Sequence, residues 1–166
     1  MENNKKIYIV LSFTNTVVGR LICTRAKLNF WNRHPGDCYS HVSISLDPKL
    51  DSMVSFARKK LHNPFIAGLV KENIRTGVFA LNPNKSNIAL FEIPITNTQY
   101  ENIDKSIKRC FDNCDELKYN FLSLITMLIC GKGICIHNRY ICTQWVAELL
   151  NSNEIYFFKI PKKQKY

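Results

Sequence analysis

The spacing of apolar residues changes along this chain, and the change restricts the possible folds more than any other feature. Residues 41–46 alternate between apolar and polar, and 6–13, 53–57 and 87–95 are short runs rich in β-branched and aromatic residues. From Thr98 onward the apolar residues recur every three or four positions, as on one face of a helix. The pattern predicts an α+β fold, with a central antiparallel sheet packed against helices.

The sheet is expected to contain a hairpin. His41 opens the alternating run, which predicts a half-buried strand that breaks at Asp47 and Pro48. Residues 53–57 would return antiparallel after a loop over 47–51. Further extended segments are expected at 77–81 and 87–95.

Four helices are expected. The first follows the capping candidates Thr14 and Asn15, and the second has a capping box of Thr98 and Glu101 and ends near Asn113. The third helix is expected at about Asn120–Gly131, where the terminal glycine can adopt positive φ. The fourth is expected at Cys142–Leu150. A last strand at 155–160 and a solvated basic tail at 161–166 complete the expected single domain of residues 1–166.

Charge and cysteine content limit the classes of function. Lys and Arg number 23 against 13 Asp and Glu, a net charge of +10 that favours acidic substrates or partners. No specific nucleic-acid motif accompanies the lysine clusters, so nucleic-acid binding is the weaker alternative. The seven cysteines are irregularly spaced, which favours free thiols over a disulfide framework.

The sequence also bears on location. The longest apolar stretch, 121–130, is far shorter than the roughly 18–20 residues that a membrane-spanning helix needs. No cleavage site follows the first apolar run, so no signal peptide is expected. We therefore expect a cytoplasmic protein without a membrane span, and the sequence gives no prediction of its oligomeric state.

Cys142 is the best candidate nucleophile because a helix N-terminus stabilises a thiolate. His41, at the start of a strand, is the best candidate base, whereas His34, His62 and His137 lie in turn-like or polar segments typical of the surface. A free cysteine is often only a small buried residue, so a structural role for Cys142 stays open.

Four segments of the sequence together resemble a known family. Tyr39-Ser-His-Val-Ser-Ile-Ser-Leu46, the following hairpin strand, Lys118-Tyr-Asn-Phe121 and Tyr140-Ile-Cys-Thr-Gln-Trp-Val-Ala-Glu-Leu-Leu150 together resemble the circularly permuted papain-like cysteine hydrolases. This superfamily includes YiiX-like and lecithin retinol acyltransferase-like proteins, relatives of the NlpC-type endopeptidases. Its permuted members place the histidine before the cysteine, as His41 and Cys142 stand here. The resemblance covers about residues 7–158 and implies a permuted papain-like fold whose central antiparallel sheet forms a partial barrel.

The resemblance implies a third residue that orients the imidazole. In the family a polar side chain on the second hairpin strand has this role, and the alignment puts Ser55 there. A hydroxyl stabilises imidazolium less than a carboxylate does, so Asp47 and Asp51 remain substitutes, although both are typical turn residues. Tyr39 and Tyr140 are candidates for a second oxyanion donor beside the Cys142 backbone N–H.

The expected function is cysteine-dependent hydrolysis of a peptide or amide bond through a thioester, with no cofactor. Transfer or hydrolysis of lipid acyl groups by the same pair, or ligand binding without catalysis, remain alternatives. A metal site is a further alternative, because Cys130, Cys135, His137 and Cys142 lie close together in sequence, although their spacing is unlike that of common zinc sites.

Overall fold

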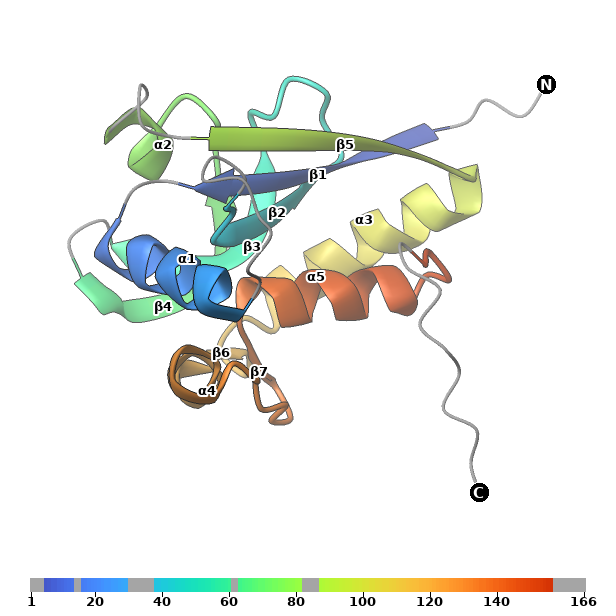
Figure 1. Ribbon diagram of the computed structural model, residues 1–166. Helices are drawn as coiled ribbons and strands as arrows, with labels where there is room; N and C mark the ends of the chain where they lie inside the picture. Colours follow the sequence, from blue (N-terminus) through green and yellow to red (C-terminus); the bar gives the residue numbers. More distant parts are fainter. Residues whose placement is uncertain (1–4, 14–15, 30–37, 61–62, 82–86, 157–166) are drawn as a thin grey trace.

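The computed structural model describes residues 5–13, 16–29, 38–60, 63–81 and 87–156. A five-stranded antiparallel sheet is built from β1 (Lys5–Phe13), β2 (His41–Ser45), β3 (Met53–Lys60), β4 (Asn63–Glu72) and β5 (Asn87–Ile95). The strand order is β4-β3-β2-β1-β5, and the sheet is open, with β4 and β5 at its edges (Figure 1).

The described helices are α1 (Val17–Asn29), α2 (Gly77–Leu81), α3 (Asn97–Asp112), α4 (Phe121–Cys130) and α5 (Cys142–Asn151). A short parallel pair, β6 (Lys118–Tyr119) and β7 (Arg139–Tyr140), flanks α4 in sequence. In Figure 1, α3 and α5 lie together along one face of the sheet, while α4 lies below the end of α5 where that helix begins.

Side chains pack against both faces of the middle of the sheet. On one face, Ile9, Ile44 and Phe56 pack against the α5 residues Trp145 and Leu149. On the other face, a smaller core is formed by side chains of β1, β3, α2 and the β2–β3 loop: Tyr8, Val10, Leu50, Met53 and Phe79. The prediction that β2 is half-buried is therefore wrong, because Ser43 and Ser45 on the second face are as buried as Val42 and Ile44.

Several predicted elements are found. The hairpin, the strand at 87–95, the αL cap at Gly131 and the helix beginning at Cys142 all stand as predicted. The capping box of α3 lies two residues earlier than predicted, with Thr96 as N-cap and Gln99 as its partner.

Other predictions are wrong or lie outside the described residues. Residues 77–81 form α2 instead of an extended segment, and β4 was not predicted at all. Residues 155 and 156 are not in a strand, and 157–166 lie outside the described residues, as do Thr14 and Asn15. No helix in the described part of the chain is long and apolar enough to cross a membrane.

One disulfide is present. Cys23 of α1 and Cys38, three residues before His41, are bonded across a sequence separation of 15 residues. The other five cysteines are free, in line with the prediction that most are thiols. The bridge attaches α1 to the segment that leads into β2.

The packing of Phe56 gives a test of this core. Its ring is 1% exposed, and its centroid lies 5.3 Å from that of Tyr140 and 5.9 Å from that of Trp145. Phe56→Ala should lower the free energy of unfolding by about 3–5 kcal/mol, because it leaves a cavity between β3 and α5. Denaturant unfolding measures the loss. Phe65→Ala, at an 80% exposed site on β4, is the matched control and should cost less than about 1 kcal/mol; equal losses would contradict the described packing.

Candidate active site

Cys142 is the first residue of α5, as the sequence predicts, and it is 9% exposed. Trp145 and Val146, one turn further along, are buried against β2 and β3 and fix the rotation of the helix. Gln144 accepts a hydrogen bond from the Ile141 N–H at 3.1 Å, which satisfies a backbone donor just before the helix. The thiol is thus almost completely covered by the protein.

The Cys142 sulfur is surrounded by donors. The backbone N–H groups of Val42 and Thr143 hydrogen-bond to it, as does the ring of His41. A buried thiolate needs such partners because it has lost its hydration. The start of α5 and the start of β2 thus meet at one sulfur atom.

His41 is the first residue of β2 and is nearly covered. Its Nε2 lies 3.0 Å from Oε2 of Glu72 and 3.2 Å from Oγ of Ser43. Since Nε2 is turned toward these groups, Nδ1 is the ring nitrogen that remains for the sulfur of Cys142.

Glu72, the last residue of β4, is the carboxylate of the site. Its Oε2 accepts hydrogen bonds from Ser43 Oγ and Ser55 Oγ, each at 2.7 Å, in addition to its contact with His41. Glu72 pairs with Met53 of β3, so its side chain leaves the same face of the sheet as Ser55 and reaches across β3 toward β2. Three strands therefore contribute to one polar cluster.

The structure places Ser55 one step further from the imidazole than the resemblance implies. Its hydroxyl donates to Glu72, and Glu72 contacts the ring of His41. The third polar group is thus a carboxylate, a stronger partner for imidazolium than a hydroxyl. Ser55 and Ser43 hold that carboxylate in place.

The two charges of the pair support each other. Burial alone would lower the pKa of His41, but the nearby Glu72 carboxylate and Cys142 thiolate outweigh it and raise this pKa well above its ordinary value. Burial would likewise raise the pKa of Glu72, but the charge of His41 and the hydrogen bonds from His41, Ser55 and Ser43 lower it to about 2. Glu72 and His41 are therefore both ionised near neutral pH.

The same argument holds for the thiol. Burial would raise the pKa of Cys142, but the charge and hydrogen bond of His41, together with the two backbone donors, lower it below its ordinary value. The arrangement thus favours a thiolate and an imidazolium, the state of an activated cysteine nucleophile.

The charge of Cys142 also acts on a tyrosine that the sequence analysis did not name as a candidate donor. Burial raises the pKa of Tyr119 in β6, and the charge of Cys142 raises it further, so its phenol remains protonated. Tyr140, one of the two predicted candidates, instead donates to Glu148 at 3.0 Å. Tyr39 is partly exposed in the segment before β2. Tyr119 is the phenol whose pKa responds to the thiolate.

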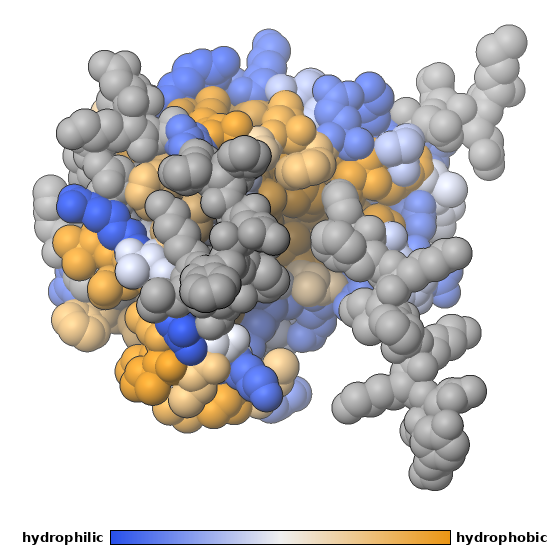
Figure 2. Space-filling model, viewed as in Figure 1, coloured by the Kyte–Doolittle hydropathy of each residue, from blue (hydrophilic) through white to orange (hydrophobic). Residues whose placement is uncertain are grey.

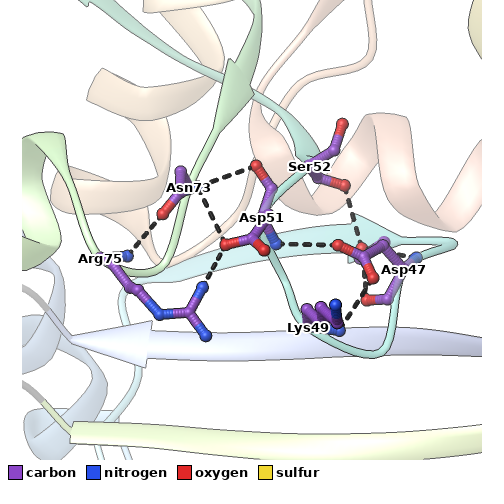
Figure 3. A network of polar contacts seen from close by, with 7 residues as sticks. Asp47, Lys49, Asp51, Ser52, Asn73 and Arg75 are labelled. Atoms are coloured by element: carbon purple, nitrogen blue, oxygen red, sulfur yellow. Dashed lines mark hydrogen bonds and ion pairs between the residues drawn. The ribbon is translucent and has the colours of Figure 1, made fainter.

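Asp47 and Asp51, the proposed substitutes for Ser55, lie outside the cluster around His41. They organise the β2–β3 loop, where Asp47 accepts from the N–H groups of Lys49 and Asp51 (Figure 3). Asp51 accepts from Asn73 and forms an ion pair with Arg75, both just after Glu72. The two aspartates therefore fix the end of β4 instead of touching the imidazole.

The other candidate residues do not join the site. Cys130 and Cys135 are exposed, and His137 is exposed in the loop between α4 and β7. No cluster of three or more metal-ligating side chains occurs within the described part of the chain. His34 and His62 lie outside it. A groove of about 510 Å³ between the β2–β3 hairpin and α3 is lined by Ile44, Tyr100 and Phe111 among others and does not include Cys142.

Glu72 was missed because β4 was missed. The strand contains Pro64 and Gly68, which weaken a strand pattern, and it lacks clean alternation. A signal was present: Val70-Lys71-Glu72 ends a run of apolar residues beside a turn, where a carboxylate can reach the rim of a sheet.

Comparison of the chain with protein-family models, curated proteins and solved structures finds no match in any of the three. The geometry of the site therefore stands by itself.

The thiol gives a first test of the ion pair. Alkylation of Cys142 by iodoacetamide, followed by mass spectrometry across a pH series, should show half-maximal rate below pH 9.0, the ordinary pKa of a thiol. Glu72→Gln weakens the imidazolium and should lower the Cys142 rate at neutral pH by about tenfold, equivalent to one pKa unit. Glu101→Gln, at an exposed position of α3, is the matched control and should leave the rate unchanged. An unshifted profile in the Gln variant would show that the carboxylate does not act on the thiol.

Acid unfolding gives a second test. The folded-state pKa of Glu72 is about 2 against an ordinary 4.5, so its contribution to stability is complete above pH 4.5 and is lost as the pH falls toward 2. The difference amounts to about 3 kcal/mol. Denaturant titrations between pH 7 and pH 2 should show this loss in the wild type and a much flatter profile in Glu72→Gln. Parallel profiles would contradict the low pKa of Glu72.

Proposed function

We propose that the protein is a cysteine hydrolase of the permuted papain-like type, with Cys142 as nucleophile, His41 as general acid and base, and Glu72 as the residue that orients the imidazole. The observation that carries this proposal is the buried series of Cys142, His41 and Glu72, in which the pKa of the thiol is lowered and that of the imidazole is raised. A structural cysteine in an apolar core has its pKa raised instead.

The chemistry follows from this series. The Cys142 thiolate attacks the carbonyl carbon of a peptide or amide bond, and a carbon–sulfur bond forms. The imidazolium of His41 gives its proton to the leaving amine as the carbon–nitrogen bond breaks, leaving a thioester. Water, deprotonated by the now neutral His41, hydrolyses the thioester and restores the thiolate.

Two donors are available for the oxyanion. The backbone N–H of Cys142 lies at the start of α5, where the helix provides no partner for it. The phenol of Tyr119 is the second candidate, because burial keeps it protonated and the charge of Cys142 contributes to its raised pKa. Tyr119 replaces Tyr39 and Tyr140 in this role.

The order of the elements supports the family assignment. His41 starts the first strand of the hairpin, and Cys142 starts a late helix that packs on that strand, as in permuted papain-like enzymes. The position of Glu72 on the strand after the hairpin departs from the family pattern. A thioester can also pass its acyl group to an acceptor other than water, so acyl transfer is tested alongside hydrolysis.

The test is turnover of a panel of peptide, amide and acyl-ester substrates. Cys142→Ser should abolish turnover with the fold intact, since the exchange changes little volume, whereas Cys110→Ser on α3 is the matched control and should retain it. His41→Ala should lower kcat by about 10²–10⁴-fold, and the double variant should be scarcely worse than Cys142→Ser because the two residues act as one unit. Tyr119→Phe should lower kcat more than KM.

The stability of these variants is measured in parallel. His41→Ala leaves the carboxylate of Glu72 buried without its counter-ion and should cost about 3–5 kcal/mol of unfolding free energy, so its activity is read well below its unfolding transition. If no substrate of the panel is turned over in a Cys142-dependent way, and Cys142→Ser binds ligand as the wild type does, the chain is a binding protein and the enzyme proposal fails.

A further inference from the structure

The surface of α4 has the reverse of the usual helix pattern. Its ten residues carry no charge, and its one fully buried side chain is Ser123, a polar residue. Leu122, Ile125 and Ile129 face outward, with Ile129 71% exposed. A surface helix ordinarily buries its apolar stripe and exposes its polar one.

Hydrogen bonds fix this orientation. Asn120 caps the helix by accepting from the Ser123 N–H, and its amide donates to the Ile134 carbonyl at 2.8 Å. Ser123 Oγ accepts from the N–H of Ile134 and from Gln144 of α5. A Cβ on Gly133 would come within 2.7 Å of that hydroxyl, so the loop passes directly over it. These hydrogen bonds hold the polar side of α4 against the rest of the protein, so its apolar side faces outward.

Neighbouring elements extend this surface. Phe65 of β4, 80% exposed, has its ring 6.4 Å from that of Phe121. We name the surface of Phe65, Phe121, Leu122, Ile125 and Ile129 the apolar patch; Figure 2 shows hydrophobic residues gathered at the lower part of the molecule, where α4 lies. A contiguous apolar patch on a solvent-exposed face is typical of a binding site.

Two basic residues border the apolar patch. Arg25 of α1 donates to the Ile129 carbonyl at 3.2 Å, and Lys132 follows the end of the helix. Three stretches of the sequence contain no Asp or Glu. They are 16–36, which includes α1, 52–71, which includes β3 and most of β4, and 117–147, which includes α4 and the loop after it. Glu72, at the end of β4, is turned into the site. The apolar patch is thus bordered by positive charge.

We propose that the apolar patch docks on an anionic lipid surface, with its side chains at the boundary between headgroups and acyl chains and the surrounding cations on lipid phosphates. The charge complementarity decides among occupants. A second copy of the chain would bring positive charges against positive charges. A nucleic acid would match the charge, but its phosphates would find no partner in the aliphatic side chains of the patch.

The docking surface is connected to the candidate active site. Gln144, in the first turn of α5, donates to Ser123 Oγ of α4 at 3.1 Å, and the ring of Tyr119 lies 4.8 Å from that of Phe121. Docking therefore brings the start of α5 close to the lipid. The docking itself does not depend on Cys142 being catalytic.

Co-sedimentation with vesicles tests the proposal. The full chain should bind vesicles of mixed phosphatidylcholine and phosphatidylserine, bind pure phosphatidylcholine vesicles at least tenfold more weakly, and lose binding to the mixed vesicles at about 1 M salt. Ile129→Asp and Leu122→Asp should each weaken binding at least tenfold, because each places a charge in the apolar boundary. Lys132→Glu should weaken binding to the mixed vesicles alone.

Matched controls are available on β5, where Ile88 and Leu90 are each 44% exposed. Ile88→Asp and Leu90→Asp should bind within twofold of the wild type, and Cys142→Ser should bind fully even if the enzyme proposal fails. Circular dichroism confirms that the variants are folded. Absence of binding to the mixed vesicles, or equal loss in the α4 and β5 variants, overturns the proposal. So does self-association of the wild type that Ile129→Asp abolishes, since the patch would then be an interface between copies of this chain.

Discussion

The buried contact between Glu72 and His41 is the interaction on which the rest of the site depends. A carboxylate buried on a sheet face is tolerable only with several donors, and here it has two serine hydroxyls and an imidazolium. Ser43, Ser55 and Glu72 come from three adjacent strands, so the register of β2, β3 and β4 must be correct before the cluster can form. A slip of one residue would turn each group to the opposite face. The ion pair thus specifies the pairing of the sheet as well as the ionisation of the thiol.

Local sequence patterns were sufficient to predict His41 and Cys142 as site residues but not Glu72. The start of a strand and the start of a helix are marked by turn residues and by apolar spacing, which is why His41 and Cys142 could be assigned from the sequence. Glu72 is 31 residues from His41 and reaches it across an intervening strand. No local pattern encodes such a contact, since it depends on long-range strand pairing.

The errors in the fold have related causes. Residues 77–81 have the composition of a strand, but Phe79 is buried in the smaller core, and a helical turn allows this segment to cover the sheet face. The strand at 87–95 was predicted correctly because it lies between two turn signals. For α4, the sequence predicted the helix and its glycine cap but not which side of the helix is buried. That orientation is set by hydrogen bonds among Asn120, which precedes α4, Ser123 of α4 and Gln144 of α5.

The bond between Cys23 and Cys38 gives the environment of the protein an influence on the site. A bridge that closes a loop of 15 residues restricts the unfolded chain by roughly 3 kcal/mol. Disulfides persist in oxidising compartments and open where thiols are kept reduced. Because Cys38 stands three residues before His41, the anchor of the strand that carries the imidazole is firm in one environment and loose in the other. The firmness of this attachment therefore depends on the redox conditions around the protein.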